Sequence, residues 1–447
     1  MLRRPLQRAA QQPPDDPQSR LAAVGYRATY LSHEVANQRQ RGRGLLNFPA
    51  SLLCKFYEGV ALALLRLPAV NSMPQIPVAV FLTSFDPGGT ERQMTELIRR
   101  LDDRRYRVHV VCLRQEGAWL PQAASRAASV VEFRISGFAK LATVMQLWRF
   151  AQWCRRERIS ILQTCDFYSN IFGLLGGAIA GVPVRIGSRR ELNPDKTSGQ
   201  IRVQRLAYRF ATRVVANSPA AAAILRTEGI QSSRVSMIPN GVDAGAYPER
   251  VVRPDVRRVI TVANLRPEKN HETLIAAAAQ LAESCPNLRY QIVGDGSRRS
   301  VLEKLARTRG VDHIVEFLGH REDVPALLAA ADVFVLPSRS EAFPNGAIEA
   351  MAAGLPVVAC AVGGLLDLVE TGRTGILVPP SDPEPLAAAI RSLYDNPERA
   401  AEMGMAARSE VRAQYSFERM VAAFDDLYDT ELRARHVLRA ETAQVGI

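Results

Sequence analysis

The sequence predicts an α/β protein with two Rossmann-like domains, each built on a doubly wound parallel sheet, that face each other across a cleft. Apolar runs of strand length alternate with helical segments from Pro77 onward, and the same alternation begins again near Val259. A polar stretch that contains prolines, residues 244–257, separates the two series and has the composition of a linker. In such sheets ligands bind outside the carboxyl ends of the strands. We therefore expect the ligand between the domains.

The expected strands are short and mostly apolar. In the first domain they are residues 78–84, 107–114, 159–167, 182–190, 214–219 and 235–243; in the second they are residues 259–265, 290–296, 315–319, 332–338, 356–360 and 375–380. The segments beyond about Ser381 show helical spacing as far as Tyr428. The expected boundaries are an extension at 1–73, the two domains at 74–245 and 246–415, and a C-terminal helical tail at 416–447.

The N-terminal extension has a mixed character. Residues 1–50 are rich in Arg, Gln and Pro and lack a helical or strand period, so we expect them to be disordered. Residues 48–70 are more apolar, but Lys55, Glu58 and Arg66 interrupt them and make a spanning helix a poor interpretation. They also lie too far from the N-terminus for an ordinary signal peptide. We expect an amphipathic helix that lies on a membrane or packs on the protein.

Composition narrows the classes of function. The 447 residues are 47% hydrophobic, which is enough for two or three domain cores. The net charge of +12 favours an anionic partner, but aromatic residues are only 6% and are not interleaved with basic ones, so nucleic acid ranks behind membranes and phosphorylated small molecules. The six cysteines are scattered without a Cys-x-x-Cys motif, which argues against structural zinc and fits a reducing compartment.

Residues 336–358 carry the densest signal for chemistry. A buried strand ends at a polar loop, and a helix follows from about Pro344 to Ala353. Glu341 lies in the loop and Glu349 in the second turn of the helix. The start of the helix offers backbone N–H groups and the positive end of its dipole, which suits a phosphate. Carboxylates suit hydroxyl groups better than phosphate, so the stretch indicates a nucleotide sugar.

Other candidate residues follow strands. Arg266 and Lys269 could clamp a diphosphate, since Arg makes paired contacts and Lys acts as a point charge; a solvated basic loop is the alternative. Gly88 and Gly89 could let backbone approach a ligand at a helix start, or could form an ordinary tight turn. Gly294 allows a similar approach. The Gly88–Gly89 turn lacks the G-x-G-x-x-G pattern, so a dinucleotide site has no support.

In combination, these motifs resemble those of the family 4 glycosyltransferases, which are retaining enzymes of the GT-B fold. The matching segments are PGGTE at 87–91, IPNGVD at 238–243, RPEK at 266–269, VGDG at 293–296 and, above all, the E-x7-E motif that starts at Glu341. The resemblance covers roughly residues 77–428. It implies that the first domain serves the acceptor and the second domain binds the donor.

The resemblance also implies a role for each residue. Arg266 and Lys269 would hold the donor diphosphate and help the nucleotide leave. Glu349 would accept hydrogen bonds from the ribose, and Glu341 would contact the transferred sugar. The other expected donor-binding residues are Gly88, Gly89, Gly294, Phe343, Pro344, Asn345 and Gly346. No metal or other cofactor is expected, because protein cations and helix ends replace the metal. The implied reaction is front-face transfer, in which the departing phosphate helps to deprotonate the acceptor hydroxyl.

One position departs from the family pattern. Many members carry a histidine in the segment that here reads ILQTCDFYSN, where this sequence has Cys165. Either the role of this histidine is vacant, or Asp166, Tyr168 or Asn170 has taken it over, and Asp166 is the best substitute among them. His109, the other histidine of the first domain, lies in mid-strand and is expected to be structural.

Two neighbouring arginines leave alternatives open. Arg189 and Arg190 follow a strand of the first domain and could bind a phosphate on the acceptor or be surface cations. Asp166 could also hold their loop in a structural role.

The sequence therefore predicts a metal-independent retaining hexosyltransferase. It would move a sugar from a UDP- or GDP-sugar to a hydroxyl of a glycan or lipid-linked acceptor in polysaccharide or glycoconjugate biosynthesis. The expected location is cytoplasmic, peripheral on the inner face of the plasma membrane, with no nucleic-acid partner. A GT-B-type nucleotide-sugar epimerase and a catalytically impaired nucleotide-sugar-binding protein are the alternatives. The presence of Glu341, Glu349, Arg266 and Lys269 favours an intact donor site.

Overall fold

The computed structural model describes residues 75–137, 140–192, 196–248 and 254–435. These residues belong to a compact unit that is distinct from residues 1–73. The expectations for the N-terminal extension, including its amphipathic segment at 48–70, lie outside the described residues. None of the described helices is both long and apolar enough to span a membrane.

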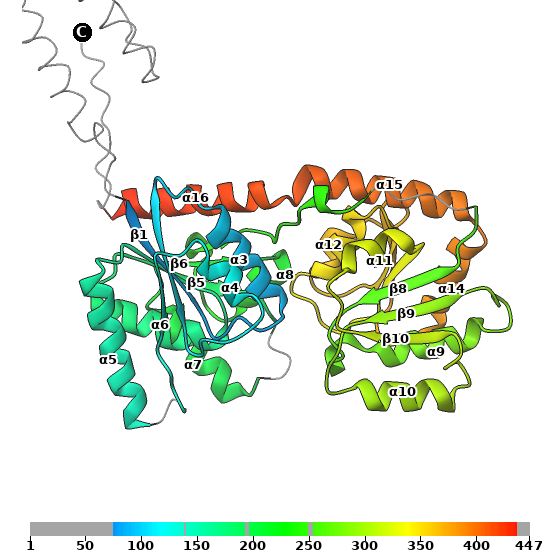
Figure 1. The fold of residues 1–447 in the computed structure, drawn as a ribbon, viewed down its shortest axis with the longest axis horizontal. Coiled ribbons are helices and arrows are strands. Elements are labelled where there is room, and N and C mark those ends of the chain that lie inside the picture. Colours follow the sequence, from blue (N-terminus) through cyan, green and yellow to red (C-terminus); the bar gives the residue numbers. More distant parts are fainter. Residues whose placement is uncertain (1–74, 138–139, 193–195, 249–253, 436–447) are drawn as a thin grey trace, which may run out of the picture. The chain divides into compact units, whose positions relative to one another are not determined.

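The first sheet has seven described parallel strands in the order β3-β2-β1-β4-β5-β6-β7. They are β1 (Ile76–Leu82), β2 (Tyr106–Cys112), β3 (Ser129–Glu132), β4 (Ile161–Thr164), β5 (Val184–Arg189), β6 (Arg213–Ala216) and β7 (Val235–Met237). Figure 1 labels β1, β5 and β6 among the helices of this domain. The six predicted strands are confirmed. The edge strand β3 was not predicted, because its four residues are all half-buried and show no alternation between a buried and an exposed face.

Helices cover both faces of this sheet. They are α3 (Gly89–Arg100), α4 (Leu120–Ala124), α5 (Leu141–Arg156), α6 (Phe167–Ala180), α7 (Ser198–Tyr208) and α8 (Pro219–Thr227). Val78, Val80 and Leu82 of β1 pack in one apolar cluster with α3, whereas Ala79 and Phe81 pack in another with α5 and α6. Alternate residues of a strand point to opposite faces, so β1 is buried on both.

The second sheet has six described parallel strands in the order β10-β9-β8-β11-β12-β13. They correspond to the six predicted strands. They are β8 (Arg258–Val262), β9 (Arg289–Val293), β10 (Val315–Gly319), β11 (Val333–Leu336), β12 (Val357–Cys360) and β13 (Gly375–Val378). The connecting helices are α9 (His271–Leu281), α10 (Arg299–Thr308), α11 (Val324–Ala330), α12 (Asn345–Ala352), α13 (Leu365–Leu368) and α14 (Pro383–Tyr394).

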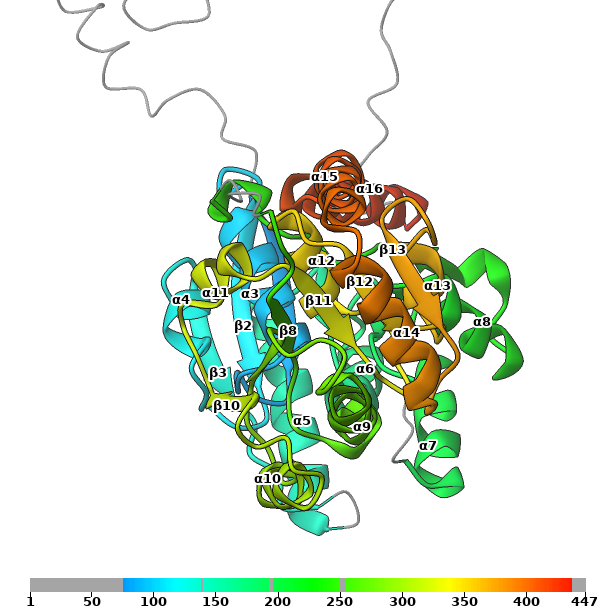
Figure 2. The same ribbon diagram turned by 90° about the vertical axis from the view of Figure 1, so that its right-hand side faces the viewer.

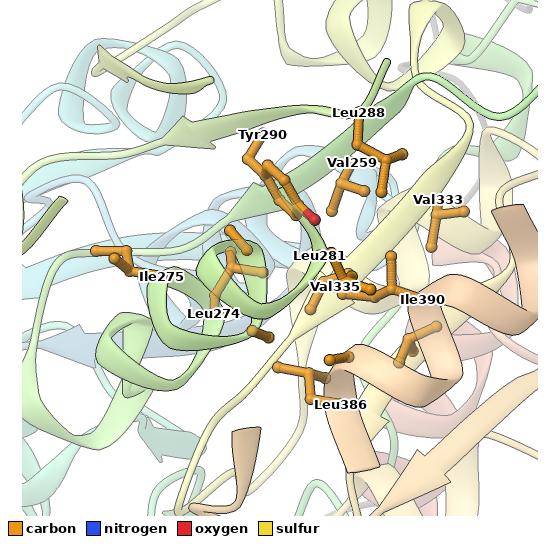
Figure 3. Packing of buried hydrophobic residues seen from close by; sticks show 14 of the residues in the cluster. Val259, Leu274, Ile275, Leu281, Leu288, Tyr290, Val333, Val335, Leu386 and Ile390 are labelled. Carbon is orange, nitrogen blue, oxygen red and sulfur yellow. The ribbon is translucent and has the colours of Figure 1, made fainter. Parts of the chain in front are cut away.

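The second sheet also separates two apolar clusters. Figure 3 shows one of them, in which Val259, Tyr290 and Val335 of the sheet meet Leu274 of α9 and Ile390 of α14. The other lies on the opposite face and joins the strands to α11 and α12. The predicted helix after the polar loop is confirmed as α12, within a residue at each end.

The last two described helices connect the two sheets. Ala407 and Val411 of α15 (Pro397–Gln414) pack in a cluster of the second sheet, whereas Phe424 and Tyr428 of α16 (Phe417–Ala434) pack with β1 and β2 of the first. Figure 2 shows α15 and α16 together along one edge of the described chain. The turn between them meets the other connection between the sheets, because the N–H of Val242 donates to the carbonyl of Tyr415 at 2.8 Å.

Both sheets have a point where the strand order reverses. In the first sheet it lies between β1 and β4, and in the second between β8 and β11. The loops that leave these strands at their carboxyl ends diverge to opposite faces and leave a crevice, which is the usual ligand position in doubly wound sheets. All the candidate carboxylates and cations of the E-x7-E and RPEK motifs follow β8 or β11.

Candidate active site

The two loops at the second switch point are joined by an ion pair. Nζ of Lys269 lies 2.7 Å from Oε1 of Glu341, and the hydroxyl of Ser338 donates to the same oxygen at 2.7 Å. Glu341 is 5% exposed and Lys269 is 23% exposed. An ammonium group has three N–H donors, and Glu341 takes one of them. The lysine can therefore hold this carboxylate and a ligand phosphate together.

The start of α12 lies against the end of β8. A Cβ atom on Gly346 would sit 2.5 Å from the carbonyl oxygen of Val262, so only glycine allows this approach. Pro344 occupies the N-cap position, and Asn345 begins the helix. The first-turn N–H groups of α12 consequently lie at the carboxyl edge of the second sheet, where a phosphate would be favoured.

Glu349 is paired with a residue of the first domain. Arg92 on α3 donates from Nη1 to Oε1 of Glu349, and it also bonds the phenol of Tyr247. Burial raises the pKa of Glu349, while the positive charge of Arg92 acts in the opposite direction. The pKa of Arg92 is raised, chiefly by Glu349. Glu349, which is expected to accept hydrogen bonds from the ribose, is thus a buried carboxylate. Arg92 of the opposite domain binds one of its two oxygens.

The paired glycines of the first domain face the start of α12. A Cβ atom on Gly89 would overlap the side-chain amide of Asn345, and one on Gly88 would overlap the carboxylate of Glu91. Asn345 Oδ1 accepts from Asn240 Nδ2 at 2.8 Å. The expected donor-binding residues Gly88, Gly89 and Asn345 are therefore brought together.

Gln93 extends this contact into the IPNGVD turn. Its Nε2 lies 3.4 Å from Oδ1 of Asn345 and donates to the carbonyl of Gly241 at 2.8 Å, while Gly241 N–H donates to Gln93 Oε1 at 2.9 Å. Gln93 is buried at 2% exposure. The IPNGVD motif thus connects α3 to α12 through Gln93.

Glu91 is the second acidic group between the domains. Burial raises its pKa to about 7, the charges of Asp166 and Asp86 add to this effect, and Arg266 opposes it. Arg266 itself is exposed and stands just before the short 3-10 helix η3 (Pro267–Lys269). An exposed arginine beside the Gly88–Gly89 turn and close to Lys269 is well placed to meet a diphosphate.

Three further glycines allow the backbone of neighbouring loops to pack in close contact with the loops of the site. Gly294 (φ +132°) directly follows β9, and its Cβ position is filled by the carbonyl of Ala263 in the loop that leads to Arg266. Gly363 (φ +51°) and Gly364 similarly lie against the carbonyls of the loop that holds Glu341. The N–H of Gly364 donates to the carbonyl of Glu341 at 3.0 Å. In the structure these glycines shape the site loops from behind.

Asp166 has several structural partners. Its carboxylate accepts from the N–H and hydroxyl of Thr83, both at 2.6 Å, and caps α6 through the N–H groups of Tyr168 and Ser169. These bonds join the ends of β1 and β4 at the first switch point. Cys165 is fully buried beside it, and burial raises the pKa of its thiol.

The remaining candidates around Cys165 differ in exposure. Tyr168 is 38% exposed at the start of α6. Asn170 is buried and joins β4 to β5, because it accepts from Thr164 at 2.7 Å and donates to the Ser188 carbonyl at 2.7 Å. His109 is buried in β2 against Ser129, in agreement with a structural role.

Arg189 and Arg190 are buried, so their interpretation as surface cations is wrong. Arg189 is 2% exposed and pairs with Glu228 at 2.9 Å and Gln204 at 2.6 Å. Arg190 is 8% exposed, and its Nη1 donates to Asn240 at 2.8 Å. Burial lowers the pKa of Arg190 to about 10. Asn240 thus links Arg190 to the start of α12.

The sequence did not identify Arg92, Gln93 and Tyr247 as site residues, and it gave Glu91 no role. Glu91, Arg92 and Gln93 come one residue after the paired glycines, in the first turns of α3. Their position just beyond the first strand of the domain was the feature of the sequence that could have identified them as site residues. Among the described residues, no group of three His, Cys, Asp or Glu side chains gathers as metal ligands would.

Two family models match the chain. The model described as Glycosyltransferase Family 4 matches residues 87–246, and the model described as Glycosyl transferases group 1 matches residues 248–410. The boundary between the two matches lies in the linker between the sheets.

Individual relatives agree with these matches. D-inositol 3-phosphate glycosyltransferase 2 of Catenulispora acidiphila is 30% identical over 399 residues, which cover 79% of this chain and 92% of the relative. The glycogen synthase of Mycobacterium tuberculosis is 34% identical over 200 residues, which cover 44% of this chain and only about half, 48%, of that relative's length.

The fold has counterparts among solved structures. Anabaena Alr3699/HepE, solved in complex with UDP and glucose, superposes with a TM-score of 0.71 at 23% identity, and the match covers 80% of this chain and 100% of that one. Two parallel-sheet domains in this arrangement are the GT-B fold. The chain therefore belongs to glycosyltransferase family 4 and is a glycosyltransferase of the GT-B type.

Proposed function

We propose that the protein is a retaining hexosyltransferase that uses a UDP- or GDP-sugar and needs no metal ion. The observation that carries this proposal is the Lys269–Glu341 ion pair beside the start of α12, with Glu349 one turn further along the helix. Cations and helix N–H groups can bind a diphosphate, and carboxylates can accept hydrogen bonds from the hydroxyls of the sugar and the ribose. Two loops of the second domain, which follow β8 and β11, thus supply both kinds of group.

In the proposed reaction, Lys269 and Arg266 stabilise the charge on the diphosphate as it departs. The bond between the anomeric carbon and the phosphate oxygen breaks, and the acceptor oxygen bonds to that carbon on the same face. The acceptor proton passes to the departing phosphate oxygen. Glu341 accepts hydrogen bonds from the hydroxyls of the sugar, and the hydrogen bonds from Lys269 and Ser338 keep this carboxylate oriented. Positioned cations of this kind stabilise the transition state directly.

The acceptor is proposed to be a hydroxyl of a glycan or lipid-linked molecule in polysaccharide or glycoconjugate synthesis. The names of relatives, a glycogen synthase and a D-inositol 3-phosphate glycosyltransferase, support a hydroxyl-rich acceptor. The UDP and glucose in the Anabaena complex make UDP-sugars the first donors to test. A cytoplasmic location peripheral to the inner membrane face remains part of the proposal.

Donor turnover tests the proposal. Purified protein is incubated with radiolabelled UDP- and GDP-sugars, and hydrolysis or transfer is measured for wild type, Lys269→Ala, Glu349→Ala and the exposed control Lys304→Ala. We expect the two site variants to lose at least about a hundredfold in kcat/KM, in line with the loss of a transition-state cation or a buried acceptor, and Lys304→Ala to match wild type. Equal turnover by all four proteins would refute the donor-site assignment.

Two further measurements separate the alternatives. Full activity in EDTA supports the metal-free mechanism, whereas loss in EDTA and recovery with Mn²⁺ would overturn it. Conversion of the donor into its epimer without an acceptor would identify an epimerase. Nucleotide-dependent thermal stabilisation without any turnover would identify a catalytically impaired binding protein, because a ligand that binds only the folded state raises its stability.

A further inference from the structure

Helix α5 exposes four large apolar side chains on one face. Leu141 is 77% exposed, Val144 59%, Met145 58% and Trp148 59%. Their spacing of three, four and seven residues places them side by side along two turns. Scattered single apolar residues are normal on a protein surface, but a continuous stripe indicates an interaction site.

The stripe is the outer face of a helix whose inner face is already used. Phe150, Trp153 and Cys154 of α5 are buried in the cluster that includes Phe81 and Phe172. Figure 1 shows α5 at the left edge of the first sheet, on the side away from the second sheet. The stripe therefore faces outward from the core of its own domain.

The second half of the same face is basic. Arg149, Arg155 and Arg156 are exposed in the last two turns, and the sixteen residues Leu141–Arg156 contain no Asp or Glu. At 1.5 Å per residue, Trp148 and Arg156 are about 12 Å apart along the axis. One helix face thus changes from apolar to cationic along its length.

A groove beside the arginines could hold a headgroup. It has a volume of about 570 Å³ between β3 and α5 and is lined by Val131, Glu132, Phe133, Arg149, Gln152, Trp153, Arg155 and Arg156. Arg155 is fixed there, because its guanidinium donates to the carbonyls of Ala180 at 3.3 Å and Ile179 at 2.5 Å. An arginine held in this way suits a phosphodiester. Arg156, which also pairs with Glu157 at 3.1 Å, lies beside it.

We propose that α5 docks this protein onto an anionic lipid bilayer. Leu141, Val144, Met145 and Trp148 enter the acyl boundary, and the three arginines contact lipid phosphates. Helices of this type lie with their apolar face about 5–10 Å deep in the interface, and each basic residue adds attraction to anionic lipid. This inference rests on the membrane location in the proposed function and names the surface responsible for it. The surface is independent of residues 48–70 and of the donor chemistry, so it can fail without the donor-site assignment failing.

Vesicle binding by the full chain tests the proposal. Vesicles of phosphatidylcholine, with or without phosphatidylglycerol, are sedimented with wild type, Leu141→Ser/Trp148→Ser, Arg149→Glu/Arg156→Glu and the control Val301→Ser/Met405→Ser. Val301 and Met405 are exposed apolar residues on other helices. We expect wild type and the control to bind the anionic vesicles and each α5 variant to bind about tenfold more weakly or less. Equal binding by all proteins overturns the proposal.

Fluorescence places α5 itself at the membrane. Brominated lipids quench a tryptophan that enters the acyl region, and the chain has three tryptophans. The quenching lost in Trp148→Phe should account for most of the wild-type signal; unchanged quenching overturns the proposal. A shift in oligomeric state or melting temperature of the serine variant, with vesicle binding unchanged, would show that a second copy or residues 1–73 cover the stripe. Hydrolysis of soluble donor should not change in any α5 variant.

Discussion

At the scale of single residues, Arg92 gives Glu349 a property that the E-x7-E motif alone does not show. Burial raises the pKa of Glu349, and a protonated carboxyl accepts ribose hydrogen bonds poorly. The ion pair with Arg92 opposes this effect from the other domain. Removal of one partner from a buried pair leaves an uncompensated charge, which is strongly unfavourable.

We therefore expect Arg92→Ala to weaken UDP binding by about tenfold or more at pH 6 and by less at pH 8. The pKa of Glu349 would rise without its cation, so binding would recover as the carboxyl ionises with rising pH. Isothermal titration calorimetry at several pH values measures the affinity for UDP. Arg99→Ala on the exposed side of α3 is the matched control. A loss that is independent of pH would contradict the coupling between Arg92 and Glu349.

His271 links pH to the stability of the second domain. It is 1% exposed at the start of α9, and neither ring nitrogen has a hydrogen-bond partner in the described part of the chain. Burial lowers its pKa from 6.5 to about 4, and the nearby charge of Lys269 adds to this effect. Between these values the unfolded chain binds the proton and the folded chain does not, so stability falls as pH falls.

The His271 effect should reach about 3 kcal/mol between pH 6.5 and pH 4. We expect urea unfolding of wild type to weaken over this window more steeply than that of His271→Leu, because leucine has no proton to bind. The exposed His313→Leu is the control and should follow wild type. Parallel curves for wild type and His271→Leu would contradict the prediction.

At the scale of elements, the site loops are packed through glycine. The turn after β12 is pressed onto the loop of Glu341 at Gly363, whereas Gly372 has a similar left-handed backbone with no other atom within 4 Å of its Cβ position. Substitution of these two glycines therefore distinguishes the cost of a left-handed backbone, which both share, from the cost of a close contact, which only Gly363 has.

We expect Gly372→Ala to lower the free energy of unfolding by about 1 kcal/mol, the cost of a left-handed backbone for alanine. Gly363→Ala should cost about 1–3 kcal/mol more, because the new methyl group displaces the Glu341 loop. It should also weaken nucleotide binding, which Gly372→Ala should leave unchanged. Chemical denaturation and calorimetry measure the two effects. Equal losses in both variants would show that close approach at Gly363 has no cost.

The strands and α12 could be predicted from the sequence because their signals are local. Apolar runs mark the strands, and Pro344 and Gly354 mark the start and the end of α12. The edge strand β3 was missed because it has no apolar alternation. Arg92 was missed because its role depends on which residue faces it across the sheets, and the chain has 57 Lys and Arg residues from which to choose. The burial of Arg189 and Arg190 was misjudged for the same reason, since Glu228 and Asn240 are distant in sequence.

At the scale of the whole described chain, the first sheet is completed by the last helix. Phe417, Met420, Phe424, Leu427, Tyr428 and Leu432 of α16 belong to the same buried cluster as β1 and β2. The ring of Tyr428 packs edge-on against Tyr106, with 5.8 Å between ring centres. The first domain is therefore discontinuous in sequence.

Deletion of residues 416–447 should unfold the first domain. Burial of six large side chains contributes roughly 10 kcal/mol, comparable with the entire stability of a typical domain. Hydrogen exchange should show lost protection in β1 and β2 and retained protection in β8 and β9. Deletion of residues 436–447 alone, which leaves α16 intact, is the control. Retained protection in β1 after the longer deletion would contradict the packing argument.

The position of α16 also sets an order for folding during synthesis. The strands of the first sheet leave the ribosome first, but the helix that closes their core leaves after all of β8 to α15. Domains generally fold as units when their residues become available. The second domain can therefore finish its core while the first still exposes apolar surface, so the domain that is translated first is completed last.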